Sequence, residues 1–133
     1  MGIPFGLKMG FVKYNPNPDG NYVDDCAVRA MSIAMGKSWD QIYLDLCAQG
    51  YLLKNMPSSK MVCAEYLISQ GYRCTAMVDI CPACYTVEDF AIDNPEGTYI
   101  LATGSHVVAV VDGDYIDTWD SGGEVPIYYW RQT

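Results

Sequence analysis

Three side chains in this sequence are of the types that a thiol-nucleophile site requires. His106 is the only histidine among the 133 residues, and it opens an apolar stretch rich in valine. Cys26 lies far upstream, at the start of an expected helix, and Asp117 follows the valine stretch. An imidazole can take the proton of a thiol, and a carboxylate can orient the imidazole. The three residues therefore predict a nucleophile, a general base and an orienting acid.

The choice of Asp117 as the acid rests on a predicted β-hairpin. Asp112-Gly113 is a strong signal for a two-residue hairpin turn. With that turn, His106 faces Trp119, and Asp117 lies diagonally on the same face, about 7–8 Å away between backbones. Asp120, the competing acid, would point to the opposite face. We therefore expect Asp117 to bind the imidazole and Trp119 to cover that hydrogen bond from solvent.

The surroundings of Cys26 bear on its ionisation and on the stabilisation of an oxyanion. A helix N-terminus favours a thiolate, whereas the neighbouring carboxylates of Asp24 and Asp25 disfavour it. Either carboxylate also suits the N-cap of that helix. The backbone N–H of Cys26 and one upstream side-chain donor would form the oxyanion site, and Asn21 is the only amide side chain nearby.

The elements that must position these residues are helices first and strands later. Cap and stop signals predict helices over residues 26–35 and 38–48, and a third helix that starts near Ser58 or Ser59 and ends before Gly71. A short helix is expected to open at Thr86 and to end at Asn94-Pro95. β-branched and aromatic runs predict strands over residues 72–78, 98–103, 105–111, 114–119 and 125–130. This order is typical of an α+β fold. We expect a single domain over residues 1–133, with N-terminal helices packed against a C-terminal antiparallel β-sheet and an extended N-terminal arm over residues 1–22.

Helical spacing predicts which side chains face the core. In the second helix, which Gly50 is expected to close, these are Ile42, Tyr43 and Leu46. In the third helix they are Val62, Tyr66 and Leu67.

Composition narrows the possible partners. The net charge is −8, which disfavours nucleic acid and anionic membranes because both attract basic surfaces. No apolar run is long enough for a transmembrane helix, and the N-terminal residues do not read as a secretory signal. We therefore expect a cytoplasmic protein whose six cysteines are free thiols.

The motifs Asp25-Cys26, Gly104-Ser105-His106 and Asp117-Thr118-Trp119, in this order, resemble those of the papain-like cysteine peptidase superfamily. The chain is most similar to the small bacterial and phage-type members, including those that process bacteriocin leaders. The resemblance spans residues 20–120 and implies helices packed on an antiparallel sheet, with the site in the cleft between them. It also implies Cys26 as nucleophile, His106 as general base, Asp117 as orienting acid, no cofactor, and a peptide or protein substrate.

The chain departs from this family upstream of its cysteine. The family usually has glutamine six residues before the cysteine, where this chain has Gly20, and Asn21 stands one residue later. Transglutaminases, amidases and acyltransferases share the same three catalytic residue types, so the reaction class extends beyond peptidases.

Two other readings remain open at the level of sequence. A papain-like fold can serve as a binding module without catalysis. Cys81-Pro82-Ala83-Cys84 has the spacing of a redox pair, and with Cys63 and Cys74 it would supply four thiols for zinc, although the spacing of the latter two is poor.

Overall fold

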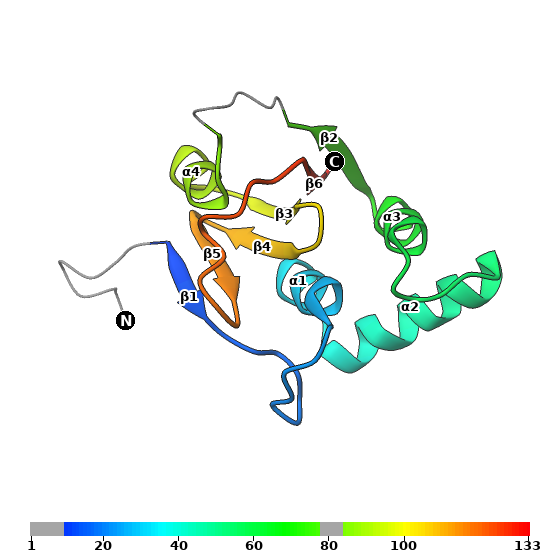
Figure 1. Ribbon diagram of the computed structural model, residues 1–133. Coiled ribbons are helices and arrows are strands. Elements are labelled where there is room, and N and C mark those ends of the chain that lie inside the picture. Colours follow the sequence, from blue (N-terminus) through cyan, green and yellow to red (C-terminus); the bar gives the residue numbers. More distant parts are fainter. Residues whose placement is uncertain (1–9, 78–83) are drawn as a thin grey trace.

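The computed structural model describes residues 10–77 and 84–133 (Figure 1). Within these residues the chain is α+β, with four helices and a six-stranded sheet. The elements are β1 (Phe11–Lys13), α1 (Cys26–Met35), α2 (Trp39–Leu53), α3 (Lys60–Ser69), β2 (Tyr72–Ala76), α4 (Val87–Asp93), β3 (Thr98–Ala102), β4 (Val107–Val111), β5 (Asp114–Asp117) and β6 (Tyr128–Gln132). From α1 onward, the order of helices and strands is the predicted one.

The sheet is mixed rather than wholly antiparallel. Its strand order is β1-β5-β4-β3-β6-β2, and β1 pairs with β5 in parallel. The prediction that residues 1–22 form only an extended arm is wrong for residues 11–13, because they form a strand that pairs with β5 at one edge of the sheet. The remaining pairings are antiparallel. A three-residue strand gives too short a pattern for the sequence to reveal it.

The predicted turn between β4 and β5 is confirmed. Val111 lies opposite Asp114, as the two-residue loop requires. Asp112 and Gly113 both have positive φ, 49° and 84°. Positive φ at both central positions defines the turn type whose twist matches that of a hairpin. The register that selected Asp117 is therefore the register of the structure.

Local caps explain where the helices begin. The Ser38 side chain accepts a hydrogen bond from the backbone of Gln41 at 3.0 Å, and Thr86 forms a reciprocal capping box with Asp89. The prediction that Gly50 closes the second helix is wrong, since α2 continues to Leu53. A Cβ at Gly50 would lie 2.7 Å from the backbone oxygen of Asn55, so glycine here permits the close approach of the following loop.

The sheet is covered on both faces (Figure 1). Helices α1, α2 and α3 pack on one face, and α4 packs on the other. The first core contains the residues Ala30, Met31, Ile42, Leu46, Val62, Tyr66, Leu67, Tyr72, Ile100, Ala109 and Trp130. The second contains Val87, Phe90, Ala91, Tyr99, Leu101, Val108, Val110 and Tyr115. Burial on both faces explains why β4 is apolar at every position.

The predicted inward positions are confirmed with one exception. The side chains of Ile42 and Leu46 in α2 are buried, as are those expected in α3. Tyr43 is 48% exposed, and its ring stacks on Trp39 at a centroid distance of 5.0 Å. The prediction for Tyr43 is wrong because Trp39 gives its ring a partner on the surface of α2.

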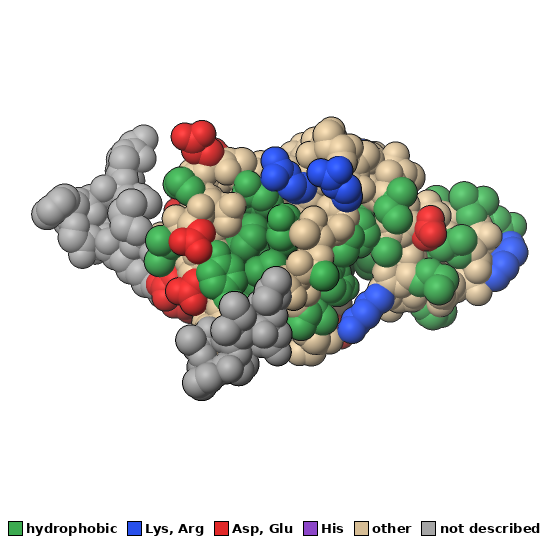
Figure 2. Space-filling model, turned by 90° about the horizontal axis from the view of Figure 1, so that it is seen from above, with side chains coloured by type: hydrophobic (Ala, Val, Ile, Leu, Met, Phe, Trp, Pro, Cys, Tyr) green, Lys and Arg blue, Asp and Glu red, His purple; other side chains and the backbone are tan. Residues whose placement is uncertain are grey.

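No helix in the two described stretches is long and apolar enough to cross a membrane. Acidic side chains gather at the end of the surface in Figure 2 where α4 lies, while lysine and arginine lie toward its centre and its opposite end. Helix α4 contributes Glu88, Asp89 and Asp93.

Candidate active site

His106 and Asp117 meet at one end of the β4–β5 hairpin. Nε2 of His106 lies 2.6 Å from Oδ2 of Asp117. His106 stands just before β4, where a tight turn holds its backbone. Thr103 N–H donates to the His106 carbonyl at 2.8 Å, and His106 N–H donates to Oγ1 of Thr103 at 2.9 Å. The backbone of the imidazole-bearing residue is thus fixed from both sides.

Cys26 reaches the same imidazole from the first turn of α1. It is the first residue of that helix, is half-buried and carries a free thiol. Its side chain lies near enough to that of His106 to raise the pKa of the imidazole. Because Nε2 is taken by Asp117, Nδ1 is the ring nitrogen left to face the sulfur. The structure therefore brings together all three residues that the sequence singled out.

The environment makes the imidazole a stronger base. Burial alone would lower the pKa of His106, but the hydrogen bond to Asp117, the nearby side chain of Cys26 and the charges of these two groups raise it from 6.5 to about 9. Burial alone would raise the pKa of Asp117, yet hydrogen bonds from His106 and Ser121 hold it below its ordinary value of 3.8. The raised pKa of His106 means that the ring readily accepts a proton, and the lowered pKa of Asp117 keeps its carboxylate ionised beside the ring.

Asp117 is held by partners that the sequence did not single out. Its side chain is 2% exposed. The Ser121 hydroxyl donates to Oδ2 at 2.7 Å, and the Thr118 backbone N–H donates to Oδ1 at 2.8 Å. Arg29 donates to Oδ1 at 3.3 Å. Every polar atom that a carboxylate offers here is engaged, so its orientation toward His106 is fixed.

Arg29 connects the helix of the nucleophile to the strand of the acid. It is buried, at 7% exposure, and forms ion pairs with Asp25 and Asp117. Since Arg29 lies one turn after Cys26, its guanidinium locks α1 against the end of β5. Arg29 is the only charged residue of α1, whose other residues are apolar except for Ser32. This isolated charge was the signal in the sequence.

The prediction that Asp24 or Asp25 caps α1 through its side chain is wrong. Asp25 occupies the N-cap but makes no capping hydrogen bond. Its carboxylate is buried and instead accepts from Arg29 and, at 2.9 Å, from the Trp39 indole. The first backbone N–H groups of α1 therefore donate no hydrogen bond to this carboxylate.

The other candidates near the hairpin take different places. The ring of Trp119 lies 4.9 Å from the ring of His106 between centroids, and Trp119 remains 45% exposed. It therefore shields one side of the imidazole. Asp120 accepts a hydrogen bond from the Tyr115 hydroxyl at 2.7 Å, whereas Asp117 is the acid that binds the imidazole, as the predicted register requires.

Asn21 lies in an exposed turn that precedes α1. Its backbone accepts from the Asn15 side chain at 3.0 Å and donates to the side chain of Asn17 at 3.3 Å. Across residues 10–77 and 84–133, no hydrogen bond joins the Asn21 side chain to Cys26 or His106. The structure thus places this residue upstream of the nucleophile without bringing its amide onto the other site residues.

The remaining cysteines divide into two groups. Cys47, Cys63 and Cys74 are free thiols. Cys84 is in a disulfide, so the prediction that all six cysteines are free is wrong at this position, while Cys81 lies outside the described residues. Among the described residues, no group of three histidine, cysteine, aspartate or glutamate side chains is arranged to hold a metal ion.

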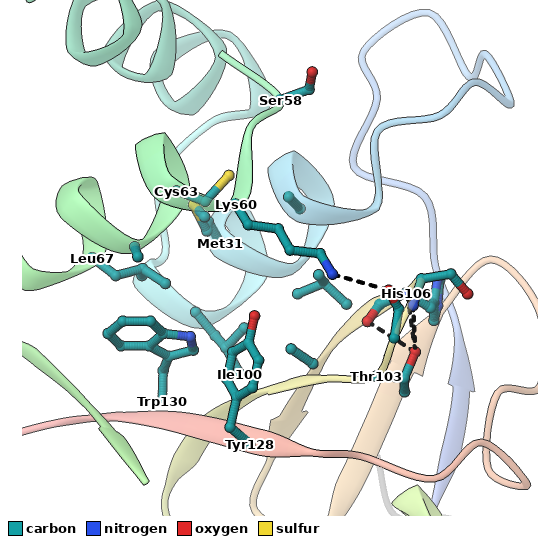
Figure 3. A pocket seen from close by; sticks show the side chains of 16 residues that line it. Met31, Ser58, Lys60, Cys63, Leu67, Ile100, Thr103, His106, Tyr128 and Trp130 are labelled. Atoms are coloured by element: carbon teal, nitrogen blue, oxygen red, sulfur yellow. Dashed lines mark hydrogen bonds between the residues drawn. The ribbon is translucent and has the colours of Figure 1, made fainter. Parts of the chain in front are cut away.

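A cavity of about 150 Å³ lies beside His106 (Figure 3). Helices α1 and α3 and strands β3, β4 and β6 form its walls. The walls are mainly apolar, with Met31, Leu67, Ile100 and Trp130 at the bottom and His106 at one end.

Comparisons of the chain with protein-family models, curated proteins and solved structures found no match. The inference of function therefore rests on the chemistry of the site itself.

Proposed function

We propose that this protein is a cysteine hydrolase of the papain-like type that cleaves amide bonds in peptides through an acyl-enzyme. One observation supports this proposal above all others. A single imidazole has the side chain of Cys26 beside it and is hydrogen-bonded to the buried carboxylate of Asp117. A thiol, an imidazole and a carboxylate in this sequence are the parts that activate a sulfur nucleophile.

The reaction follows from the positions of the protons. His106 takes the proton of Cys26, and the resulting thiolate attacks the amide carbonyl to form a tetrahedral oxyanion. The C–N bond then breaks, and the imidazolium gives its proton to the leaving amine. The carbonyl carbon remains bonded to the sulfur as a thioester. A water molecule loses a proton to His106 and attacks the thioester, which releases a carboxylic acid and regenerates the thiol and imidazole pair.

The surrounding residues have supporting roles in this scheme. Asp117 holds the imidazole with Nε2 toward the carboxylate, so Nδ1 exchanges protons with the sulfur and the leaving group. The open backbone N–H groups at the start of α1, including that of Cys26, supply donors for the oxyanion. A reducing cytoplasm would keep the Cys26 sulfur as a thiol.

The proposal is tested by the rate of alkylation at each cysteine. Iodoacetamide at pH 7, followed by mass spectrometry of the digested protein, should label Cys26 faster than Cys47 and Cys74, because those thiols have no imidazole beside them. His106→Ala should lower the Cys26 rate about 100-fold or more, the size of effect that a positioned base contributes. Asp120→Ala is the matched control and should leave the rate within about twofold.

Turnover is the second readout. A library of internally quenched peptides should be cleaved by the wild-type protein and not by Cys26→Ala, with equal folding of both proteins verified by circular dichroism. Uniform alkylation of the free cysteines together with no cleavage would contradict the hydrolase and favour a papain-like binding module.

A further inference from the structure

The cavity beside His106 combines apolar walls with the ammonium group of Lys60. Met31, Leu67, Ile100 and Trp130 are all buried or nearly so and form its interior. A cavity of about 150 Å³ with apolar walls holds a group the size of benzene. Its dimensions and chemistry therefore suit one leucine or phenylalanine side chain.

Lys60 is the only charged side chain, apart from His106, among the described residues that line the cavity. Figure 3 shows its side chain extending from α3 toward the turn that precedes β4. Its Nζ donates to the Gly104 carbonyl at 3.1 Å. Lysine has three N–H donors, so this bond leaves donors free at the cavity mouth.

In the described part of the chain, Lys60 forms no ion pair with a carboxylate. The lysine that forms one there is Lys37, with Asp45. A carbonyl oxygen does not neutralise an ammonium group. The protein as a whole has a net charge of −8, but the acidic side chains visible in Figure 2 gather mainly at the end where α4 lies. A cation beside an apolar cavity is therefore available for an anionic ligand.

We propose that this cavity binds an apolar side chain of the substrate and that Lys60 binds a carboxylate next to it. The ligand class is a peptide in which leucine or phenylalanine adjoins either a C-terminal carboxylate or an acidic residue. Since the cavity ends at His106, a peptide seated there has a neighbouring amide within reach of the site. This inference rests on the proposed function, because it names the substrate of that same site.

Binding can be measured without catalysis. Trp130 lines the cavity, whereas the Trp39 indole donates to Asp25 elsewhere. The three indole N–H signals of isotope-labelled Cys26→Ala protein can be followed by NMR during titration with four compounds: N-acetylphenylalanine, N-acetyl-glutamyl-phenylalaninamide, N-acetylphenylalaninamide and N-acetylglutamate. The Trp130 signal should move with the first three compounds, and the Trp39 signal should stay in place.

The carboxylate is expected to strengthen binding by about three- to fivefold over the neutral amide, which is the range of a partly exposed ion pair. N-acetylphenylalanine tests a C-terminal carboxylate, and the glutamyl compound tests an acidic side chain. A preference for either one supports the proposal and identifies the source of the carboxylate. N-acetylglutamate lacks the apolar group and should bind weakest.

Two pairs of variants separate the apolar and ionic parts. Lys60→Met should remove the preference for carboxylate while keeping the affinity for the amide, and Lys54→Met, which removes a lysine from the end of α2, should change neither. Ala64→Phe should fill the cavity and abolish binding, whereas Ala48→Phe adds the same group to an exposed position of α2.

An unmoved Trp130 signal with all four compounds would overturn the proposal. Equal affinity for the carboxylates and the amide, or a preference that survives Lys60→Met, would overturn the role of Lys60. Because these titrations use a protein without the nucleophile, they are independent of the alkylation test. Selective alkylation of Cys26 without ligand binding would remove this inference and leave the hydrolase in place.

Discussion

The two faces of the sheet are built on different principles. The face covered by α4 is closed by aromatic packing, in which the Phe90 ring meets Tyr99 and Tyr129 at centroid distances of 5.0 and 5.2 Å. The face covered by α1 also has an apolar core, but the end of that helix adds a buried network of Asp25, Arg29 and Asp117. The first face is held by apolar packing, and the second adds a fixed arrangement of charge to its apolar core.

This difference leads to separable consequences of mutation. Buried charges depend on one another, because removing one partner leaves the others uncompensated. Removing a buried ring costs only the contacts of that ring and the free energy of the cavity that it leaves. Changes on the face of α1 should therefore alter the titration of His106, whereas changes on the face of α4 should alter stability alone.

Arg29→Met should have the largest effect. It leaves Asp25 and Asp117 buried without their common cation, and we expect a loss of about 3–5 kcal/mol in the free energy of unfolding. Urea denaturation at pH 7 measures this loss. Arg73→Met, which removes an exposed arginine from β2, should cost under about 0.5 kcal/mol. A loss below 1 kcal/mol for Arg29→Met would show that the network is not structural.

Phe90→Ala should cost about 3 kcal/mol, at the lower end for a buried phenylalanine because α4 is short. The pKa of His106 should not change, since Phe90 contacts neither the imidazole nor Asp117. Ile92→Ala on the same helix is the control, as that side chain is 69% exposed. A changed His106 titration in Phe90→Ala would mean that the two faces are coupled.

Asp117→Asn should lower the pKa of His106 from about 9 by about one to three pH units, because the carboxylate that stabilises the imidazolium is lost. Since this is the only histidine, its ring proton signal can be followed by NMR without ambiguity. Asp120→Asn should leave the midpoint in place. A larger shift in Asp120→Asn than in Asp117→Asn would contradict the register of the hairpin.

The same two groups define how stability depends on pH. The raised pKa of His106 contributes stability that is complete below pH 6.5 and is lost as the pH rises through about 9. The lowered pKa of Asp117 contributes stability that is present above about pH 3.8 and is lost at lower pH. Asp117→Asn should therefore lose stability most at pH values between these limits.

Gly113→Ala should have the smallest effect. The residue has a φ of 84°, and a Cβ there would lie 3.3 Å from Cα of Pro95. We expect a loss of about 1–2 kcal/mol from the backbone conformation, with the titration of His106 unchanged. Gly123→Ala, where no atom lies within 4 Å of a new Cβ, should be nearly neutral by thermal denaturation.

The features that the sequence predicted correctly are those set by neighbouring residues. The Asp112-Gly113 turn fixes its own φ angles, and from these follow the register and the pairing of His106 with Asp117. The caps at Ser38, Ser59 and Thr86 likewise act within one helical turn. These local rules need no knowledge of the rest of the chain.

The features that it missed depend on distant partners. The hydrogen bond between Arg29 and Asp117 joins residues 88 positions apart. No residue next to either of them in the sequence indicates this partner. The parallel pairing of β1 with β5 also joins segments far apart in the sequence. The packing of α4 on the face opposite to α1 likewise depends on contacts with distant strands. Asp25 is of a residue type that commonly caps helices, but its carboxylate binds the buried guanidinium of Arg29, one turn later, instead.

The position of β6 also has a consequence for how the protein is made. Although β6 follows all the other strands in the sequence, it lies between β3 and β2. During synthesis β2 must therefore wait several seconds, at ordinary ribosomal speeds, before residues 128–132 exist to pair with it. Four of the five residues of β2 remain exposed in the finished fold, so the nascent strand has little apolar surface to hide during that delay.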